Sequence, residues 1–149
     1  MIALLQRVSQ AAVAVDGAEV ARIDAGLLVF VGVERGDGEA QAQRMAERLS
    51  GYRVFADDAG RMNRDVRAQG GAILLVPQFT LAADTAKGTR PSFATAAEPD
   101  RAQRLFEDLA GGLRERGVSV ACGQFGADMR VSLVNEGPVT FNLRAAPSA

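Results

Sequence analysis

The chain has 149 residues, of which one is cysteine and none is histidine or tryptophan. A Ser-His-Asp triad and an imidazole zinc site are therefore excluded, and one thiol forms no disulfide within the chain. The net charge of −1, from 17 basic and 18 acidic residues, argues against wrapping a long nucleic acid, because such binding depends on neutralising phosphates. Catalysis would have to use hydroxyls, carboxylates, backbone amides, an oxygen-bound metal or groups of the substrate.

The length predicts a single domain over residues 1–149, and 48% hydrophobic with 23% charged residues is ordinary for a soluble globular protein. Residues 1–7 lack a basic segment followed by a long apolar run, so they do not form a signal peptide. No stretch approaches the roughly 18 apolar residues of a membrane span. We therefore expect a cytoplasmic protein that does not contact a membrane.

The first half of the chain is predicted to be mainly β-structure around one helix. Two strands, with a break near Ser9, and a hairpin turn at Asp16 and Gly17 are expected over residues 2–17. The helix is predicted with Asp37 as its N-cap and an end near Gly51, because apolar residues recur at i, i+3, i+4 and i+7, namely Ala42, Met45, Ala46 and Leu49. Further strands are expected at residues 20–23, 26–33, 52–55 and 72–76.

The second half begins with a long connection over residues 77–98, which in a compact domain is typically functional. A second helix, ended by Gly117, follows from the helical spacing of Ala102, Leu105, Phe106, Leu109 and Leu113. Strands at 118–122, 128–134 and 139–143 then surround a sharp turn at residues 135–138, and residues 145–149 are expected to be a frayed tail. This order of elements indicates a layered domain with two helices on a β core.

A polar and aromatic segment, Gln78, Phe79 and Thr80, follows the expected strand end at Pro77. Such a strand end can present backbone N–H groups to a developing oxyanion. Thr80 could act as a nucleophile, but it has no histidine to activate it. The alternative is that Gln78 and Thr80 only satisfy local backbone groups.

A basic loop carries Lys87 and Arg90 on either side of Gly88 and Thr89. Both side chains could contact phosphate, and the planar guanidinium of arginine suits that contact. The alternative is a solvated loop without a partner.

Glycine-rich segments near the C-terminus suggest two unusual backbone conformations. Pro138 interrupts the expected pair of strands, where it cannot donate to a ladder, so Gly137-Pro138 forms either a cis turn or an ordinary trans hairpin turn. Upstream, residues 123–129 suggest a bend that aims Phe125 at a site, or else a β-bulge with a core aromatic. Cys122 is expected to be a small buried hydrophobic residue.

Together these segments resemble the D-aminoacyl-tRNA deacylase family over nearly the whole chain. The resemblance is carried by motifs in matching order and spacing, namely residues 1–8, 26–29, 32–33, 78–81, 83–85, 87–88, 90–93, 125–129 and 135–140. It implies an α+β fold of three α/β/β layers, with a barrel-like mixed β core and two main helices. It also implies a homodimer and no cofactor or metal.

The function implied by the resemblance is hydrolysis of the ester between a D-amino acid, or glycine, and the 3′-terminal adenosine of tRNA. Gln78, Phe79 and Thr80 would form one wall of the catalytic pocket, which Gly137 and Pro138 of the partner subunit would enter. Arg7 would hold the Gly-Pro turn, and Phe125 and Met129 would lie near the adenosine or the dimer seam. Rigid carbonyls of such a turn can reject one enantiomer while leaving side-chain identity free.

Pro77 departs from the family pattern, which has serine at this position. Proline removes a hydroxyl and a backbone N–H, and related editing deacylases that act on L-alanyl-tRNA also begin this segment with Pro-Gln. Two alternatives follow: a proofreading deacylase of relaxed chirality, and a non-catalytic module that binds the charged tRNA end.

Overall fold

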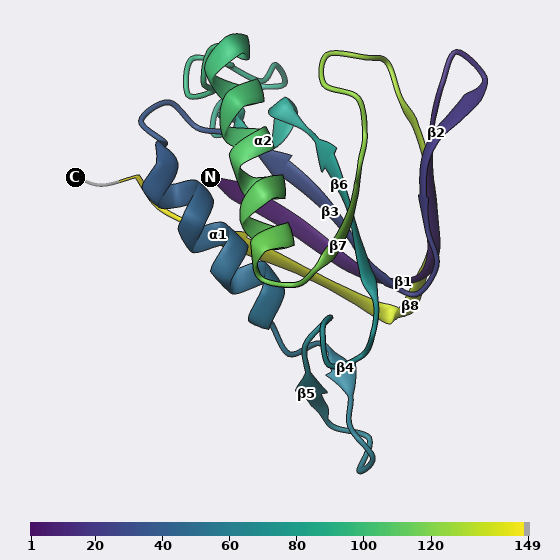
Figure 1. The fold of residues 1–149 in the computed structure, drawn as a ribbon. Coiled ribbons are helices and arrows are strands. Elements are labelled where there is room, and N and C mark those ends of the chain that lie inside the picture. The colour runs from purple at the N-terminus through teal and green to yellow at the C-terminus, as the bar shows by residue number, and fades with distance from the viewer. Residues whose placement is uncertain (148–149) are drawn as a thin grey trace.

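The computed structural model describes residues 1–147, which form one mixed β-sheet, a small hairpin and two main helices (Figure 1). The strands are β1 (Ile2–Val15), β2 (Ala18–Ile23), β3 (Gly26–Gly32), β4 (Phe55–Ala56), β5 (Met62–Arg64), β6 (Ala72–Pro77), β7 (Ser119–Cys122) and β8 (Arg130–Arg144). The helices are α1 (Glu39–Gly51), the short 3-10 helix η1 (Phe79–Ala82) and α2 (Pro99–Glu115).

Strand β1 is the centre of the sheet because it pairs along both edges. One edge pairs with β3 over residues 2–8 and with β2 over residues 11–15, and the other edge pairs with β8. The sheet continues from β3 through the parallel strands β6 and β7. The predicted break near Ser9 is wrong, since β1 is one strand; the sequence change there marks the point at which β1 exchanges β3 for β2.

Alternating side chains of the central strands divide the apolar interior into two cores. Leu27, Val29 and Val31 of β3 face one core together with residues of both helices, whereas Leu28 faces a second core enclosed by the strands. This period of two is the geometry of an extended strand, and it produces a layer of helices, a layer of sheet and a further β layer (Figure 1). The predicted α+β arrangement with a barrel-like mixed core is confirmed.

The N-terminal end of β1 is fixed by an ion pair that the sequence pattern did not indicate. Asp37, which we expected to cap α1, is fully buried and accepts from the Met1 ammonium at 2.8 Å and from the Glu34 backbone N–H at 2.7 Å. Gly38 is the N-cap instead. A buried carboxylate needs such partners, so Asp37 joins the first strand to the start of the helix.

Two further expectations are corrected, the strand at residues 52–55 and the tail at residues 145–149. The strand expected over residues 52–55 begins only at Phe55 and pairs with β5, forming an arm that projects from the body (Figure 1). The expected tail is anchored at its start, because Ala145 is buried and donates to the Met1 carbonyl at 2.9 Å; residues 148–149 lie outside the described residues. Neither main helix within residues 1–147 has the length and hydropathy that crossing a bilayer requires.

Candidate active site

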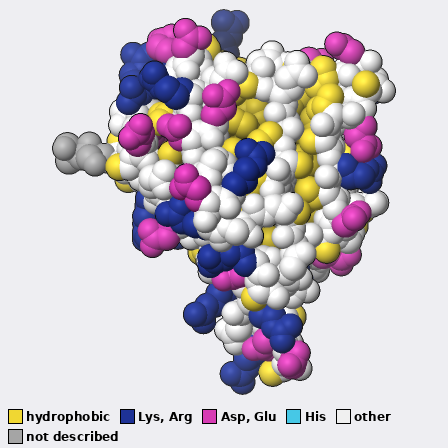
Figure 2. Space-filling view, viewed as in Figure 1, with side chains coloured by type: hydrophobic (Ala, Val, Ile, Leu, Met, Phe, Trp, Pro, Cys, Tyr) yellow, Lys and Arg dark blue, Asp and Glu magenta, His cyan; other side chains and the backbone are white. Residues whose placement is uncertain are grey.

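A cleft of about 470 Å³ lies at the end of β6, beside the N-terminal turn of α2. It brings together five of the predicted site residues: Pro77, Gln78 and Phe79 from the end of β6, and Phe125 and Met129 from the loop after β7. Figure 2 shows apolar side chains gathered in the hollow beside α2. A smaller hollow of about 140 Å³ between β1, β2 and β8 contains none of the predicted site residues.

The wall of the cleft formed by residues 77–79 is positioned by the sheet, whereas Thr80, which we expected to share this wall, does not line the cleft. The Gln78 N–H donates to the Val31 carbonyl at 2.7 Å, and the Gln78 carbonyl accepts from Leu81 at 3.1 Å, which turns the chain into η1. Gly32 permits this approach: a Cβ there would lie 2.9 Å from Leu81 Cβ and 3.1 Å from the Gln78 carbonyl oxygen. The close packing of β3 against η1 therefore requires glycine at this position.

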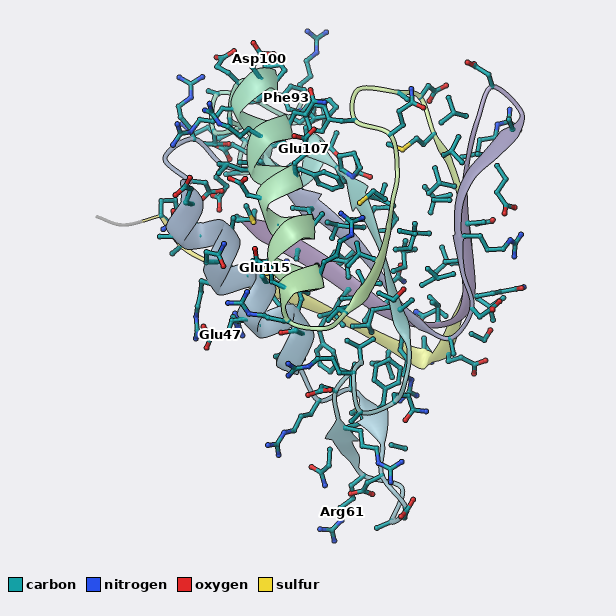
Figure 3. The ribbon with its side chains drawn as sticks, viewed as in Figure 1. Glu47, Arg61, Phe93, Asp100, Glu107 and Glu115 are labelled. Carbon is teal, nitrogen blue, oxygen red and sulfur yellow. The ribbon has the colours of Figure 1, made fainter. Side chains whose placement is uncertain are left out.

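The side chains of the segment have separate surroundings. Gln78 Nε2 donates to Thr80 Oγ1, so the two side chains bond to each other and not to the backbone groups that the alternative had expected. Phe79 is 61% exposed, and its ring centroid lies 5.1 Å from that of Phe93. Figure 3 places Phe93 beside the N-terminal end of α2. A large exposed aromatic pair next to a cleft suits contact with a planar or apolar ligand.

The opposite wall of the cleft is formed by the loop that follows β7. The chain leaves the sheet at Cys122, so the alternative of a β-bulge at residues 123–129 is wrong. Phe125 packs against Phe106 of α2 with ring centroids 6.3 Å apart, so it serves both the helical core and the cleft. Met129 packs against the second core. Burial raises the pKa of the Cys122 thiol, although the Arg114 guanidinium opposes that change, so this residue is a neutral thiol at physiological pH.

The Gly137-Pro138 segment is a loop inserted into one continuous strand, which corrects the turn expected between two strands. Gln6 pairs with Thr140 and Val8 pairs with Asn135, so a single residue of β1, Arg7, stands opposite residues 136–139 of β8. The Gly137-Pro138 peptide bond is cis, as the resemblance implied, and both residues are exposed.

Arg7 lies across the base of this loop and joins it to the arm. Its Nη1 donates to the Val54 carbonyl at 2.8 Å and its Nε donates to the Glu136 carbonyl at 3.3 Å. The predicted contact between Arg7 and the Gly-Pro segment is therefore present in the structure. A guanidinium suits this contact because its fixed N–H groups can reach two carbonyls at once.

The Gly137-Pro138 loop and the cleft lie at different levels along the sheet of one chain. Arg7 pairs with Leu27 of β3, whereas Pro77 pairs with Val31, four residues further along. At about 3.3 Å per residue, the two positions are separated by about 13 Å along the strand. Figure 3 shows that the tip of the arm at Arg61 and the residue Phe93 beside the cleft lie at opposite ends of the molecule.

Lys87 and Arg90 lie on an exposed loop outside the lining of the cleft. The loop is closed at its base by paired backbone hydrogen bonds of 2.8 and 2.9 Å between Asp84 and Ser92. The contact of these two cations with RNA stays a prediction.

The sequence did not single out the other lining residues, which are Val76, Ala97, Pro99, Ala102 and Val131, and Gly126, Ala127 and Asp128 within the motif at 125–129. Ala102 was assigned correctly to the apolar face of α2, but periodicity does not reveal that the end of this face borders a cleft. Among residues 1–147, no group of carboxylates and thiols is arranged to hold a metal ion.

The fold and the motifs indicate an aminoacyl-tRNA deacylase, and comparison with known proteins agrees. The family model described as D-Tyr-tRNA(Tyr) deacylase matches residues 4–144. A protein of Alkalilimnicola ehrlichii named D-aminoacyl-tRNA deacylase is 61% identical over 149 residues, covering 100% of this chain and 99% of that protein. One of the same name from Methylococcus capsulatus is 59% identical over 147 residues, covering 99% and 96%. The chain belongs to the D-Tyr-tRNA(Tyr) deacylase family.

Solved structures show the same fold. A structure titled "c-Myc DNA Unwinding Element Binding Protein" superposes with a TM-score of 0.93 at 33% identity, covering 98% of this chain and 99% of that chain. A second, titled as a probable eukaryotic D-amino acid tRNA deacylase, gives a TM-score of 0.81 at 18% identity, covering 95% and 98%.

The packing of η1 on β3 predicts the effect of Gly32→Ala. The added methyl group would meet the backbone of η1, so we expect the free energy of unfolding to fall by about 1–3 kcal/mol. Urea unfolding followed by circular dichroism measures this change. Gly51→Ala is the matched control, because a Cβ at Gly51 would meet nothing within 4 Å; equal stability of the two variants would contradict the account.

Proposed function

We propose that this protein hydrolyses the ester bond of D-aminoacyl-tRNA, and of mischarged glycyl-tRNA, releasing the free amino acid and tRNA. Membership of the family and relatives of 54–61% identity named D-aminoacyl-tRNA deacylase support this function. The structural observation that carries it is the meeting of Gln78 and Phe79 with Phe125 and Met129 in one cleft. The cleft has the volume usual for a small-molecule site, which suits an aminoacylated adenosine.

The active enzyme in this proposal is a homodimer in which each cleft is completed by the partner subunit. Gly137 and Pro138 are exposed, and Arg7, which stands opposite their loop, pairs with β3 about 13 Å from the position at which Pro77 pairs. A two-fold dimer brings the loop of each copy to the cleft of the other and creates two identical sites. Backbone carbonyls of the loop would accept from the substrate amino group and exclude the side chain of an L-amino acid.

The chemistry proposed for the site uses backbone groups. The N–H groups of Phe79 and Thr80 begin η1, where helical N–H groups have no partner within the turn. They can therefore stabilise the negative charge that develops on the ester carbonyl oxygen. The ribose hydroxyl of the terminal adenosine lies next to the ester in any aminoacyl-tRNA and can assist the attacking water. Lys87 and Arg90 would contact phosphates of the tRNA end.

Pro77 is the feature that favours a second candidate, a deacylase of relaxed chirality that also accepts L-alanyl-tRNA. Pro77 ends β6 opposite Val31 and lines the cleft. It supplies neither a hydroxyl nor an N–H to a substrate, so one polar contact of the family pattern is missing at this wall.

Turnover of three charged tRNAs tests the proposed function. We expect multiple-turnover release of amino acid from D-tyrosyl-tRNA and glycyl-tRNA, and much slower release from L-alanyl-tRNA. Release of L-alanine at the rate of D-tyrosine would establish the relaxed deacylase instead. Tight binding without release from any of the three would identify a binding module.

A variant of Thr80 tests whether backbone groups carry the chemistry. We expect Thr80→Ala to keep kcat for D-tyrosyl-tRNA within about tenfold of the wild type, because the amide N–H of residue 80 remains and only the hydroxyl bonded to Gln78 is lost. Single-turnover deacylation measures this rate. A loss of several orders of magnitude in a folded variant would instead identify Thr80 as the nucleophile.

A further inference from the structure

We propose that Asn135 and Thr140 are positioning residues that close the base of the Gly137-Pro138 loop and thereby set the chiral selectivity of the site. The inference rests on the proposed function for its readout in catalysis. Its structural basis is a set of hydrogen bonds between the two ends of the loop and the neighbouring strand.

The hydrogen bonds connect both ends of the inserted segment. Asn135 Oδ1 accepts from the Val139 backbone N–H at 3.2 Å, and Asn135 Nδ2 donates to Thr140 Oγ1 at 3.0 Å. Thr140 Oγ1 also accepts from Gln6 Nε2 of β1 at 3.3 Å. One hydroxyl therefore joins the residue before the loop, the residue after it and the strand alongside.

These side chains compensate for a ladder that cannot continue through the loop. Because Arg7 alone stands opposite residues 136–139, β1 has too few backbone groups to pair with all four of them. Arg7 binds the first side of the loop through the Glu136 carbonyl. Asn135 binds the second side through the Val139 N–H. The backbone between these two contacts is the part that would face the substrate.

Asn135 and Thr140 lie at or near the surface, so their replacement can alter the loop without removing core packing. Thr140 is exposed and Asn135 is half-buried. A filter made of backbone carbonyls depends on their position, and a misplacement of about 1 Å in an active site can cost about a hundredfold in rate. Loss of the hydrogen bonds at the base of the loop would therefore lower the selectivity for D-amino acids without a comparable loss in the stability of the fold.

The decisive experiment compares Thr140→Val with Thr140→Ser in the full-length protein. Valine removes the acceptor at nearly constant shape, whereas serine keeps it. We expect Thr140→Val to lower the ratio of kcat/KM for D-tyrosyl-tRNA over L-tyrosyl-tRNA by about tenfold, with an unchanged melting temperature. Thr140→Ser should retain the wild-type ratio, as should Ser132→Ala, which removes a hydroxyl elsewhere on β8.

Hydrogen exchange of the Val139 amide supplies a readout that does not depend on catalysis. We expect this amide to exchange on the order of tenfold faster in Thr140→Val than in Thr140→Ser, because its acceptor Asn135 loses its own support. A wild type without deacylase activity would overturn the proposed function. The exchange rates would still test whether Thr140 and Asn135 hold the base of the loop. Unchanged selectivity and exchange in folded Thr140→Val, or failure of serine to restore them, would overturn the present proposal.

Discussion

The pairing of β1 along both of its edges is the constraint on which the rest of the structure depends. With β3 or β2 on one side and β8 on the other, β1 cannot shift to accommodate the additional residues of β8. The residues opposite Arg7 are therefore expelled from the sheet as an exposed loop. The buried ion pair between Met1 and Asp37 fixes the beginning of the same strand. The position of the Gly137-Pro138 loop is therefore set by how β1 is held along its whole length.

The same sheet positions the cleft at its other end. Parallel pairing of β3 with β6 brings Pro77 and Gln78 level with Val31, and Gly32 lets the chain turn closely over the strand. Strand β3 thus separates the Gly137-Pro138 loop from the cleft at the end of β6, so the two do not meet within one chain. The proposed site, shared between two copies, would bring the loop of one chain to the cleft of the other.

Local patterns of the sequence predicted much of this structure. The apolar runs at residues 26–33 and 72–76 correctly predicted the buried strands β3 and β6, and the spacing from Ala42 to Leu49 correctly predicted α1. Patterns failed where distant partners decide the outcome. Asp37 binds a terminal ammonium instead of capping α1. The turn expected at residues 135–138 is a loop within a single strand, because β1 pairs with β8 on either side of it. Motifs located most of the cleft, but Ala97 and Ala102 required the assembled fold.

Mixing two defective variants tests the shared site most directly. Gly137→Val would distort the loop, since Gly137 has a φ of 125° and an added Cβ would lie 2.8 Å from Val139. Ala127→Trp would fill the cleft. Each should be inactive alone, and co-expression should restore about a quarter of wild-type activity, because half of the dimers would contain one intact cleft with one intact loop. A mixture that forms dimers but stays inactive would contradict the account.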